Sequence, residues 1–393
     1  MKYGATVAFV LLLFGSLFSL TTLFPVFYSY IIALVTFGIA SLYFLKKSRT
    51  FQAEKYSILS MVGIFLIFGW HAVTNPSGAN IVTSASVRVI IFVPVFLITV
   101  FWIPSTLPHE QFVFAVTRIG GGLSILGLLV SFGVVPPFQS EELFGRPMFL
   151  AIFGPDIQVL TSIFNDSNFA GEFLSVAAIL GLIEGRSYDN HAGYVFAGLN
   201  LVALNFTYSR AGYIAALGGI AVFWLLNRQY IITAAISTFS GIFGLAVFQA
   251  SVVSNRNIPI DVTGREYLWP ATINATLQRP LVGWGPGDRA ELIRPYLPSG
   301  ATPNTPHNSF LRFFLTSGIV GGVLYIIFTL MTIIFPLVYH QSSQERLLPP
   351  VVAVVILQSF GGFSILGLGA ISVLSAAISG YALLGVNNRT IAR

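Results

Sequence analysis

Apolar runs of about 20 residues recur along this 393-residue chain, and they restrict its fold more than any other feature. A helix of about that length crosses the hydrocarbon core of a bilayer, so each run is a candidate membrane-spanning helix. Only 9% of the residues are charged, whereas soluble proteins carry roughly 25%. The sequence therefore predicts an all-α, polytopic integral membrane protein built as a helix bundle.

We predict about twelve spans in a single membrane domain that covers residues 1–393. The first run lacks the small-residue cleavage pattern of a signal peptide, so we expect it to stay as an uncleaved span. Several of the runs are short for a full crossing. The twelve segments are 4–24, 26–45, 56–73, 81–103, 112–133, 166–184, 192–207, 211–226, 230–250, 308–338, 350–366 and 368–386.

The charges in the loops predict how the chain is oriented in the membrane. The short loop at 46–55 holds four basic residues. Short loops rich in lysine and arginine stay on the cytoplasmic side, so we expect this loop and both termini to be cytoplasmic. The long polar segment 251–306 then lies on the opposite face. We interpret it as one large extracytoplasmic loop of the membrane domain, too short to be a domain of its own.

Composition also limits the chemistry that the chain can perform. It contains no cysteine, which excludes disulfides, thiol catalysis and cysteine-ligated metals. The five histidines are scattered and the acidic residues lack the spacing of a metal motif, so we expect neither a metal nor another cofactor. The basic residues form no stripe, so nucleic acid is not an expected partner.

A histidine stands where the long loop enters the next span, within Pro306-His307-Asn308. We predict that Thr305 caps the helix and that His307 and Asn308 lie in its first turn. The positive end of the helix dipole disfavours imidazolium, so His307 should be neutral and able to accept a proton. Taken alone, a histidine at a hydrated helix terminus more often has no catalytic role.

The residues that follow His307 suggest packing and a further contact. Gly318, Gly321 and Gly322 are expected to let another helix approach closely. Arg312 lies one turn below Asn308. We interpret it either as a substrate contact or as an arginine that snorkels to the outer leaflet.

Arginine is the only basic side chain other than histidine after position 55. The planar guanidinium can bind a diphosphate through two parallel hydrogen bonds, whereas lysine acts as a point charge. Arg210 is the most informative case, because it lies between two apolar spans and would cost a few kcal/mol there unless paired or hydrated. About half of the outer arginines are expected to be ordinary solvated loop charge. The outer arginines are Arg210, Arg256, Arg265, Arg279, Arg289 and Arg294.

Four other positions carry weaker expectations. Asp166 stands at the start of a span and is predicted to cap it. Arg88 and Arg118 are predicted to be mid-span charges. His71 ends a span without a supporting motif, so its replacement should be close to neutral.

Several short motifs follow one another in the order found in one family of membrane enzymes. The motifs are Ser209-Arg210-Ala211-Gly212, then Gly264-Arg265 with Trp269, then Pro280-Leu281-Val282-Gly283-Trp284-Gly285, and finally His307-Asn308 followed after nine residues by Gly318-x-x-Gly321. Through them the chain resembles the superfamily of O-antigen ligases and polysaccharide polymerases over about residues 205–325.

The resemblance implies an inverting, metal-independent glycosyl transfer on the outer face of the cytoplasmic membrane. The donor would be a glycan on a polyprenyl diphosphate, and the acceptor a sugar hydroxyl, for example on lipid A-core, on another lipid-linked glycan or on a protein. His307 would act as the base, and Arg210 and Arg265 would bind the diphosphate. Further substrate contacts are expected from the loop and the helix after it, at Asn308, Arg279, Arg289 and Arg312.

Two alternatives remain open at this point. A polysaccharide polymerase uses the same donor chemistry, and the sequence does not separate it from a ligase. A flippase or transporter of lipid-linked glycans is a different class. It would need several charges deep within the spans, and we favour it less because only Arg88 and Arg118 are predicted there.

Overall fold

The structure of the protein is a computed structural model. It describes residues 3–21, 25–47, 55–74, 85–136, 159–164, 166–207, 209–231, 235, 264–339, 348–361 and 365–384. These ranges form helices joined by turns and contain no strand, which agrees with the predicted all-α class.

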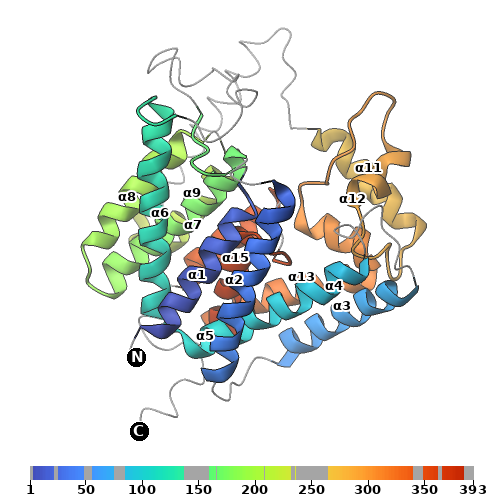
Figure 1. The fold of residues 1–393 in the computed structure, drawn as a ribbon, viewed down its shortest axis with the longest axis horizontal. Helices are drawn as coiled ribbons and strands as arrows, with labels where there is room; N and C mark the ends of the chain where they lie inside the picture. The colour runs from blue at the N-terminus through green and yellow to red at the C-terminus, as the bar shows by residue number, and fades with distance from the viewer. Residues whose placement is uncertain are drawn as a thin grey trace.

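Helices appear at eleven of the twelve predicted spans (Figure 1). The segment 230–250 lies almost wholly outside the described residues. In chain order the elements are α1 (Gly4–Phe18), α2 (Val26–Lys47), α3 (Lys55–Thr74), α4 (Ala85–Leu97), the π-helical turn η2 (Ile98–Trp102), α5 (Ile103–Thr106), α6 (His109–Ser131), α7 (Ser167–Ser187), α8 (Ala192–Asn205), α9 (Arg210–Leu226), α11 (Arg265–Gln278), α12 (Arg289–Ile293), the 3₁₀ turn η5 (Arg294–Tyr296), α13 (Ser309–Tyr339), α14 (Leu348–Ser359) and α15 (Ala370–Leu384).

Six of the described helical segments are long and apolar enough to cross a membrane. They lie in α2, α3, α4 to α5, α6, α7 and α13. Five further apolar helices, α1, α8, α9, α14 and α15, are shorter, at 10–17 residues. The structure thus supports a membrane helix bundle, while the predicted number of about twelve spans is not confirmed.

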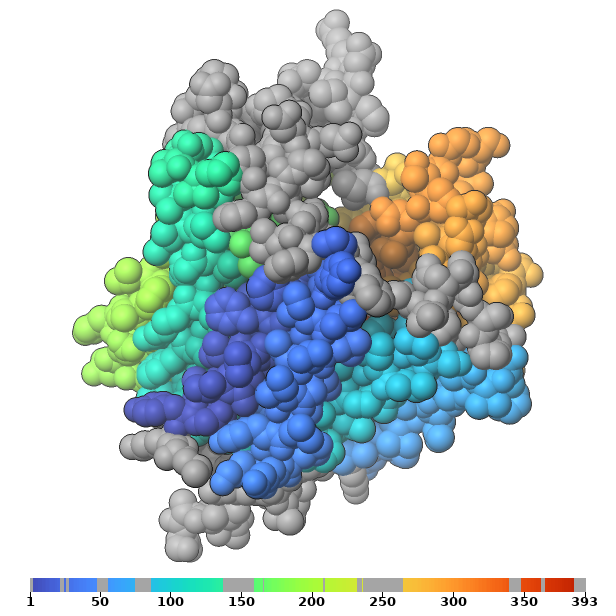
Figure 2. All heavy atoms as spheres, viewed as in Figure 1, coloured from blue at the N-terminus to red at the C-terminus, as the bar shows by residue number. Residues whose placement is uncertain are grey.

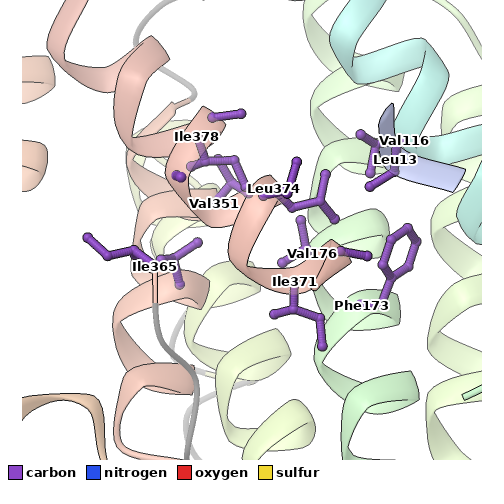
Figure 3. Packing of buried hydrophobic residues seen from close by; sticks show 14 of the residues in the cluster. Leu13, Val116, Phe173, Val176, Val351, Ile365, Ile371, Leu374 and Ile378 are labelled. Atoms are coloured by element: carbon purple, nitrogen blue, oxygen red, sulfur yellow. The ribbon is translucent and has the colours of Figure 1, made fainter. Parts of the chain in front are cut away.

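Helix α7 lies at the centre of the bundle. It packs against α6, α8, α9 and α14, and apolar side chains from these helices and from α1 and α15 fill the space around it (Figure 3). Glycines allow its closest contact, because a Cβ at Gly212 of α9 would stand 2.8 Å from the carbonyl group of Gly171. This approach places the first residue of α9 beside the first turns of α7.

One predicted mid-span charge is balanced inside the bundle. Arg118 of α6 forms an ion pair with the fully buried Glu184 of α7. Thr117 and Asn190 each donate a hydrogen bond to the same carboxylate, at 2.7 Å. The guanidinium carbon of Arg118 also lies 4.7 Å from the centroid of the Phe114 ring. The pair therefore has a structural explanation and needs no transported ion.

The described part of the long loop, 264–306, folds into α11, α12 and η5 beside the bundle (Figures 1 and 2). Four apolar side chains of the loop, Leu268, Ala271, Ala275 and Ile293, form a small core with Leu315 of α13. The loop is therefore seated on the first turns of α13 by its own apolar contacts.

Helix α13 is broken at Gly318, which has φ 66° and ψ −168°. In a continuous helix the N–H groups of residues 319 and 320 would donate to the carbonyls of residues 315 and 316. Here N–H groups of the loop segment 280–287 donate to these two carbonyls instead. Its N–H groups at Trp284 and Gly285 donate to Leu315 and Thr316, at 3.0 and 2.8 Å.

Two further hydrogen bonds run from α13 to the loop segment. The N–H groups of Ile319 and Val320 donate to the carbonyls of Pro280 and Leu281, at 2.6 and 3.4 Å. The four bonds satisfy the polar groups that the break exposes, which an apolar environment requires. The prediction that Gly318 faces another helix is therefore wrong, because it faces the backbone of the 280–287 segment.

Two side chains of the bundle hold the 280–287 segment in place. His71 of α3 is 2% exposed, and its Nε2 lies 2.8 Å from the carbonyl oxygen of Val282. Arg88 donates from Nη1 to the carbonyls of Pro286 and Gly287, at 3.0 and 2.6 Å. His71 therefore has a structural contact that the sequence did not indicate. Arg88 is likewise not a mid-span charge, because it lies in the first turn of α4 and contacts the loop.

Candidate active site

The N-terminal ends of α7, α9, α11 and α13 converge on one polar region. Asp166 caps α7 by accepting a hydrogen bond from the N–H of Asn168, as predicted, and Ser209 caps α9 by accepting one from Gly212. Gly264, with φ 74°, begins α11. The free N–H groups and dipoles of helix N-termini create a positive potential, which favours an anion at this place.

His307 lies immediately before α13. The helix begins at Ser309, and Asn308 is its cap, accepting a hydrogen bond from the N–H of Leu311 at 3.1 Å. The predicted cap at Thr305 is therefore wrong, and His307 stands outside the first turn with φ 46°. Such a left-handed backbone is uncommon for residues other than glycine and points to a position fixed by its surroundings.

Two contacts fix the backbone that carries His307. The indole Nε1 of Trp269 donates to the carbonyl of Pro306 at 2.8 Å. Arg312 donates from Nη2 to the hydroxyl of Thr305, also at 2.8 Å. The chain on the N-terminal side of His307 is thus held by α11 and by α13 itself.

The surroundings of His307 keep its imidazole neutral. Burial lowers its pKa most, and the nearby guanidinium groups of Arg312 and Arg265 lower it further. The carboxylate of Asp166 opposes this shift with a smaller effect. The expectation of a neutral imidazole is therefore supported, although burial and positive side chains produce it here.

Arg265 and Arg210 are brought together, as their predicted common role requires. Arg265 is the first residue of α11 and donates from Nη2 to the carbonyl of Gly361, at 3.2 Å. Burial lowers its pKa, and the charge of Arg210, the exposed first residue of α9, lowers it further. The Nε atom of Arg265 is buried and has no hydrogen-bond partner.

Arg289 and Arg312 share that property. The Nε atom of each is buried without a hydrogen-bond partner. Arg289 begins α12, and its pKa is lowered by burial and then by the charges of Arg312 and Arg88. Within the described ranges, Arg265, Arg289 and Arg312 form no ion pair with a carboxylate. Three guanidinium groups in the region of His307 are therefore available to an anion.

The remaining predicted contacts fall elsewhere or serve the fold. Arg279 follows the other end of α11, about 20 Å from Arg265 at 1.5 Å per residue. Its guanidinium carbon stacks 4.2 Å from the centroid of the Trp284 ring. Asn308 is 6% exposed and works as the cap of α13. Arg294 is exposed and pairs with Glu291, as expected for loop charge, and Arg256 lies outside the described residues.

Glu172 is a site residue that the sequence analysis missed. It lies on α7 and is only 3% exposed. Arg312 and Arg265 are both near enough to interact with its charge. Its Oε1 would stand 3.8 Å from a Cβ at Gly361, whose carbonyl accepts from Arg265. A carboxylate within a predicted membrane span was the signal that could have identified it.

The described residues contain no group of three His, Asp or Glu side chains that could hold a metal ion. The cations that they offer to an anionic substrate are guanidinium groups. A neutral imidazole beside several such groups can accept a proton while the guanidinium groups hold a negative charge. Fold and site together define an integral membrane protein with a polar, cationic site at one end of its bundle.

Comparison with known families covers the part of the chain that contains most of this region. Residues 195–326, about a third of the chain, match the family model described as O-antigen ligase. The resemblance noted in the sequence is confirmed over this range. The matched range contains Arg210, Arg265 and His307. It supports a membrane enzyme of the ligase or polymerase type. Comparison with curated proteins finds none that matches the chain.

Proposed function

We propose that the protein is a glycosyltransferase that moves a glycan from a polyprenyl diphosphate to the hydroxyl group of an acceptor sugar. One observation carries the proposal. The half-buried side chains of Arg265, Arg289 and Arg312 have buried Nε atoms without partners, and they lie in the region of a neutral His307. Cationic groups that form no ion pair are costly in such a place, so their arrangement suits a strongly anionic substrate.

His307 would begin the reaction by accepting the proton of the acceptor hydroxyl. The acceptor oxygen then forms a bond to the anomeric carbon, and the bond from this carbon to the diphosphate oxygen breaks on the opposite face, with inversion. The electron pair leaves with the polyprenyl diphosphate. Arg265 and Arg210 would stabilise the charge that develops there, which is the largest single contribution in many enzymes. A well-placed base contributes about 10²–10⁴-fold.

Within this class, the identity of the acceptor distinguishes a ligase from a polymerase. A ligase would use lipid A-core or a protein, whereas a polymerase would use a second lipid-linked glycan. We place ligase first and polymerase second. Mass spectrometry of surface glycans from a deletion strain separates them, because loss of transfer to lipid A-core differs from shortening of the chains. A flippase is less well supported, since Arg118 is paired with Glu184 and Arg88 contacts the loop.

The proposed location is the cytoplasmic membrane, with both termini inside and the site on the outer face. The chain has no cysteine, so single cysteines can be labelled without background. A cysteine at the exposed Ser299 should react with an impermeant maleimide in intact cells. A cysteine at Ser48, a position outside the described residues, should be protected. The reverse pattern would move the site to the cytoplasmic face.

The decisive experiment is a transfer assay with purified protein and a lipid-linked donor. His307→Asn is the best variant, because asparagine also tolerates a left-handed backbone, and it should lower turnover by at least about 100-fold. Arg265→Lys should also lower turnover strongly, since lysine cannot reproduce the forked contact. Arg294→Lys is the matched control on the loop surface and should be mild. Activity should persist in EDTA.

Two results would overturn the proposal. Full turnover by His307→Asn would remove the proton acceptor from the mechanism. Equal tolerance of lysine at positions 265 and 294, with normal protein levels, would remove the diphosphate contact. A strict requirement for added Mg²⁺ or Mn²⁺ would leave the transfer in place but contradict its metal independence.

A further inference from the structure

One face of α11 is both apolar and exposed. Its side chains Pro270, Ile273 and Leu277 recur at a spacing that places them on the same side of the helix. The opposite side of α11 packs in the small core that seats the loop on α13. Leu277 is 61% exposed, and Leu281, four residues further on, is 68% exposed. The apolar face therefore continues past the end of the helix into the 280–287 segment.

The exposed face of α11 changes in character along the helix. Its first turn exposes Glu266, and the preceding Arg265 belongs to the polar region around His307. Its last turn exposes Leu277. Helices with an apolar face settle at the boundary between the lipid headgroups and the acyl chains. A charged N-terminal end and an apolar C-terminal end suit an oblique position at that boundary, with the C-terminal end deeper.

The 280–287 segment joins this apolar face to the outer surface of α3. The carbonyl oxygen of Val282 lies 2.8 Å from Nε2 of His71, near the end of α3. Helix α3 is long and apolar enough to cross a membrane, so its exposed apolar side contacts acyl chains. The exposed apolar residues on that side of α3 include Leu59, Leu66, Trp70 and Val73.

The same segment is joined on its other side to α13. The N–H groups of Ile319 and Val320 donate to the carbonyls of Pro280 and Leu281. The side chains of Ile319, Val320 and Val323 are exposed on α13, which is also long enough to cross a membrane. The exposed Leu281 and Val282 are therefore held between two helices whose own exposed side chains are apolar.

We propose that Ile273, Leu277 and Leu281 contact the acyl chains of the bilayer. The C-terminal half of α11 then lies within the leaflet on the side of the site, and its N-terminal end stays in the polar region. A contiguous exposed apolar patch marks a surface for a membrane or for another protein. Here the patch is continuous with the lipid-facing sides of α3 and α13, which favours the membrane. This inference rests on the spanning helices and not on the proposed function.

Arg279 fits the same placement. It is exposed at the C-terminal end of α11, between Leu277 and Leu281, and its guanidinium carbon lies 4.2 Å from the centroid of the Trp284 ring. Arginine can reach the headgroups with its charge while its stem lies along apolar surface. Tryptophan is enriched at the same level of a membrane. Arg279 and Trp284 would therefore mark the headgroup level beside the apolar end of α11.

Spin labelling of the full-length protein tests this depth, because the chain has no cysteine and single cysteines can be labelled. The protein is placed in nanodiscs of phosphatidylethanolamine and phosphatidylglycerol. Oxygen collects in the acyl chains, whereas a water-soluble nickel chelate is excluded from them. A nitroxide at Leu277 should show an oxygen-to-nickel accessibility ratio close to that at Leu66 of α3. The ratio should be severalfold higher than at Ser299, an exposed position of the loop.

The matched control lies on the same face of the same helix. A nitroxide at the exposed Glu266, about three turns before Leu277, should be accessible to the nickel chelate, as at Ser299. Equal oxygen preference at 266 and 277 would overturn the proposed orientation of α11.

Two other outcomes would overturn the lipid contact itself. Nickel access at Leu277 equal to that at Ser299 would show that the face lies in water. Exclusion of both oxygen and the nickel chelate from Leu277 would show that a protein surface covers it, such as a second copy of the chain. These measurements involve no glycan transfer, so their result is independent of the proposed function.

Discussion

Replacement of Gly318 by alanine should release the loop segment from α13. The residue has φ 66° and ψ −168°, a region that is essentially restricted to glycine and costs other residues about 1–3 kcal/mol. A Cβ there would also stand 2.3 Å from the carbonyl carbon and oxygen of Leu281. Both atoms belong to the backbone, so the 280–287 segment would have to withdraw.

The magnitude follows from the bonds that withdrawal would break. Four backbone hydrogen bonds join residues 280–285 to α13, each worth about 1 kcal/mol net. Loss of about two of them, added to the backbone strain, weakens docking by roughly 3–5 kcal/mol. Every 1.4 kcal/mol is tenfold, so the opened population should rise by roughly two to three and a half orders of magnitude.

Hydrogen exchange of the purified protein measures this directly. The peptide that contains Trp284 and Gly285 should lose protection in Gly318→Ala by that factor, while peptides from α7 keep theirs. Gly122→Ala is the matched control, because a Cβ at Gly122 of α6 meets nothing within 4 Å. Unchanged protection at residues 284 and 285 in Gly318→Ala would refute the idea that the segment braces the break.

Three further predictions follow from contacts within the bundle and around the site. His71→Ala should reduce exchange protection of the 280–287 segment by about tenfold, in line with one lost hydrogen bond, and equal protection would show the contact to be dispensable. Glu184→Gln should lower the free energy of unfolding by roughly 2–3 kcal/mol in denaturant titrations. This is less than the loss expected for a fully buried pair, because the partner arginine is partly exposed. Glu291→Gln, in the exposed pair, should lower it by less than about 1 kcal/mol. The lowered pKa of His307 keeps the base neutral to lower pH, so the acid limb of kcat/KM should lie below about pH 6.5. In Arg312→Gln this pKa should rise and the limb should move to higher pH, and a limb that stays in place would contradict the electrostatic account.

The sequence located most of the helices, for an identifiable reason. Long apolar runs are a strong local signal, and eleven of the predicted runs coincide with helices, although five of these helices have only 10–17 residues. Arg210 stood out because a charged residue beside an apolar span is costly unless it has a role, whereas Arg265 and His307 stood out through the motifs that resemble the ligase family. The structure brings these three together at the ends of α9, α11 and α13.

The sequence could not give features that depend on distant partners. Thr305 and Asn308 are both good helix caps, and the choice of Asn308 accompanies contacts from Trp269 and Arg312 to the preceding residues. The glycine at 318 fits both a helix contact and a broken helix. The backbone of the 280–287 segment supplies the missing hydrogen bonds. These bonds satisfy the polar groups at the break, which would otherwise be costly in an apolar setting.

The turns of α13 before the break at Gly318 join the loop to the bundle. Leu315 packs in the small core of the loop, whereas Phe313 packs in the core of the bundle. His307 lies immediately before this shared segment and Arg312 lies on it. A change in the 280–287 segment would therefore act on the loop and on the polar region together, and the contact of Phe313 with the bundle would limit how far either one shifts.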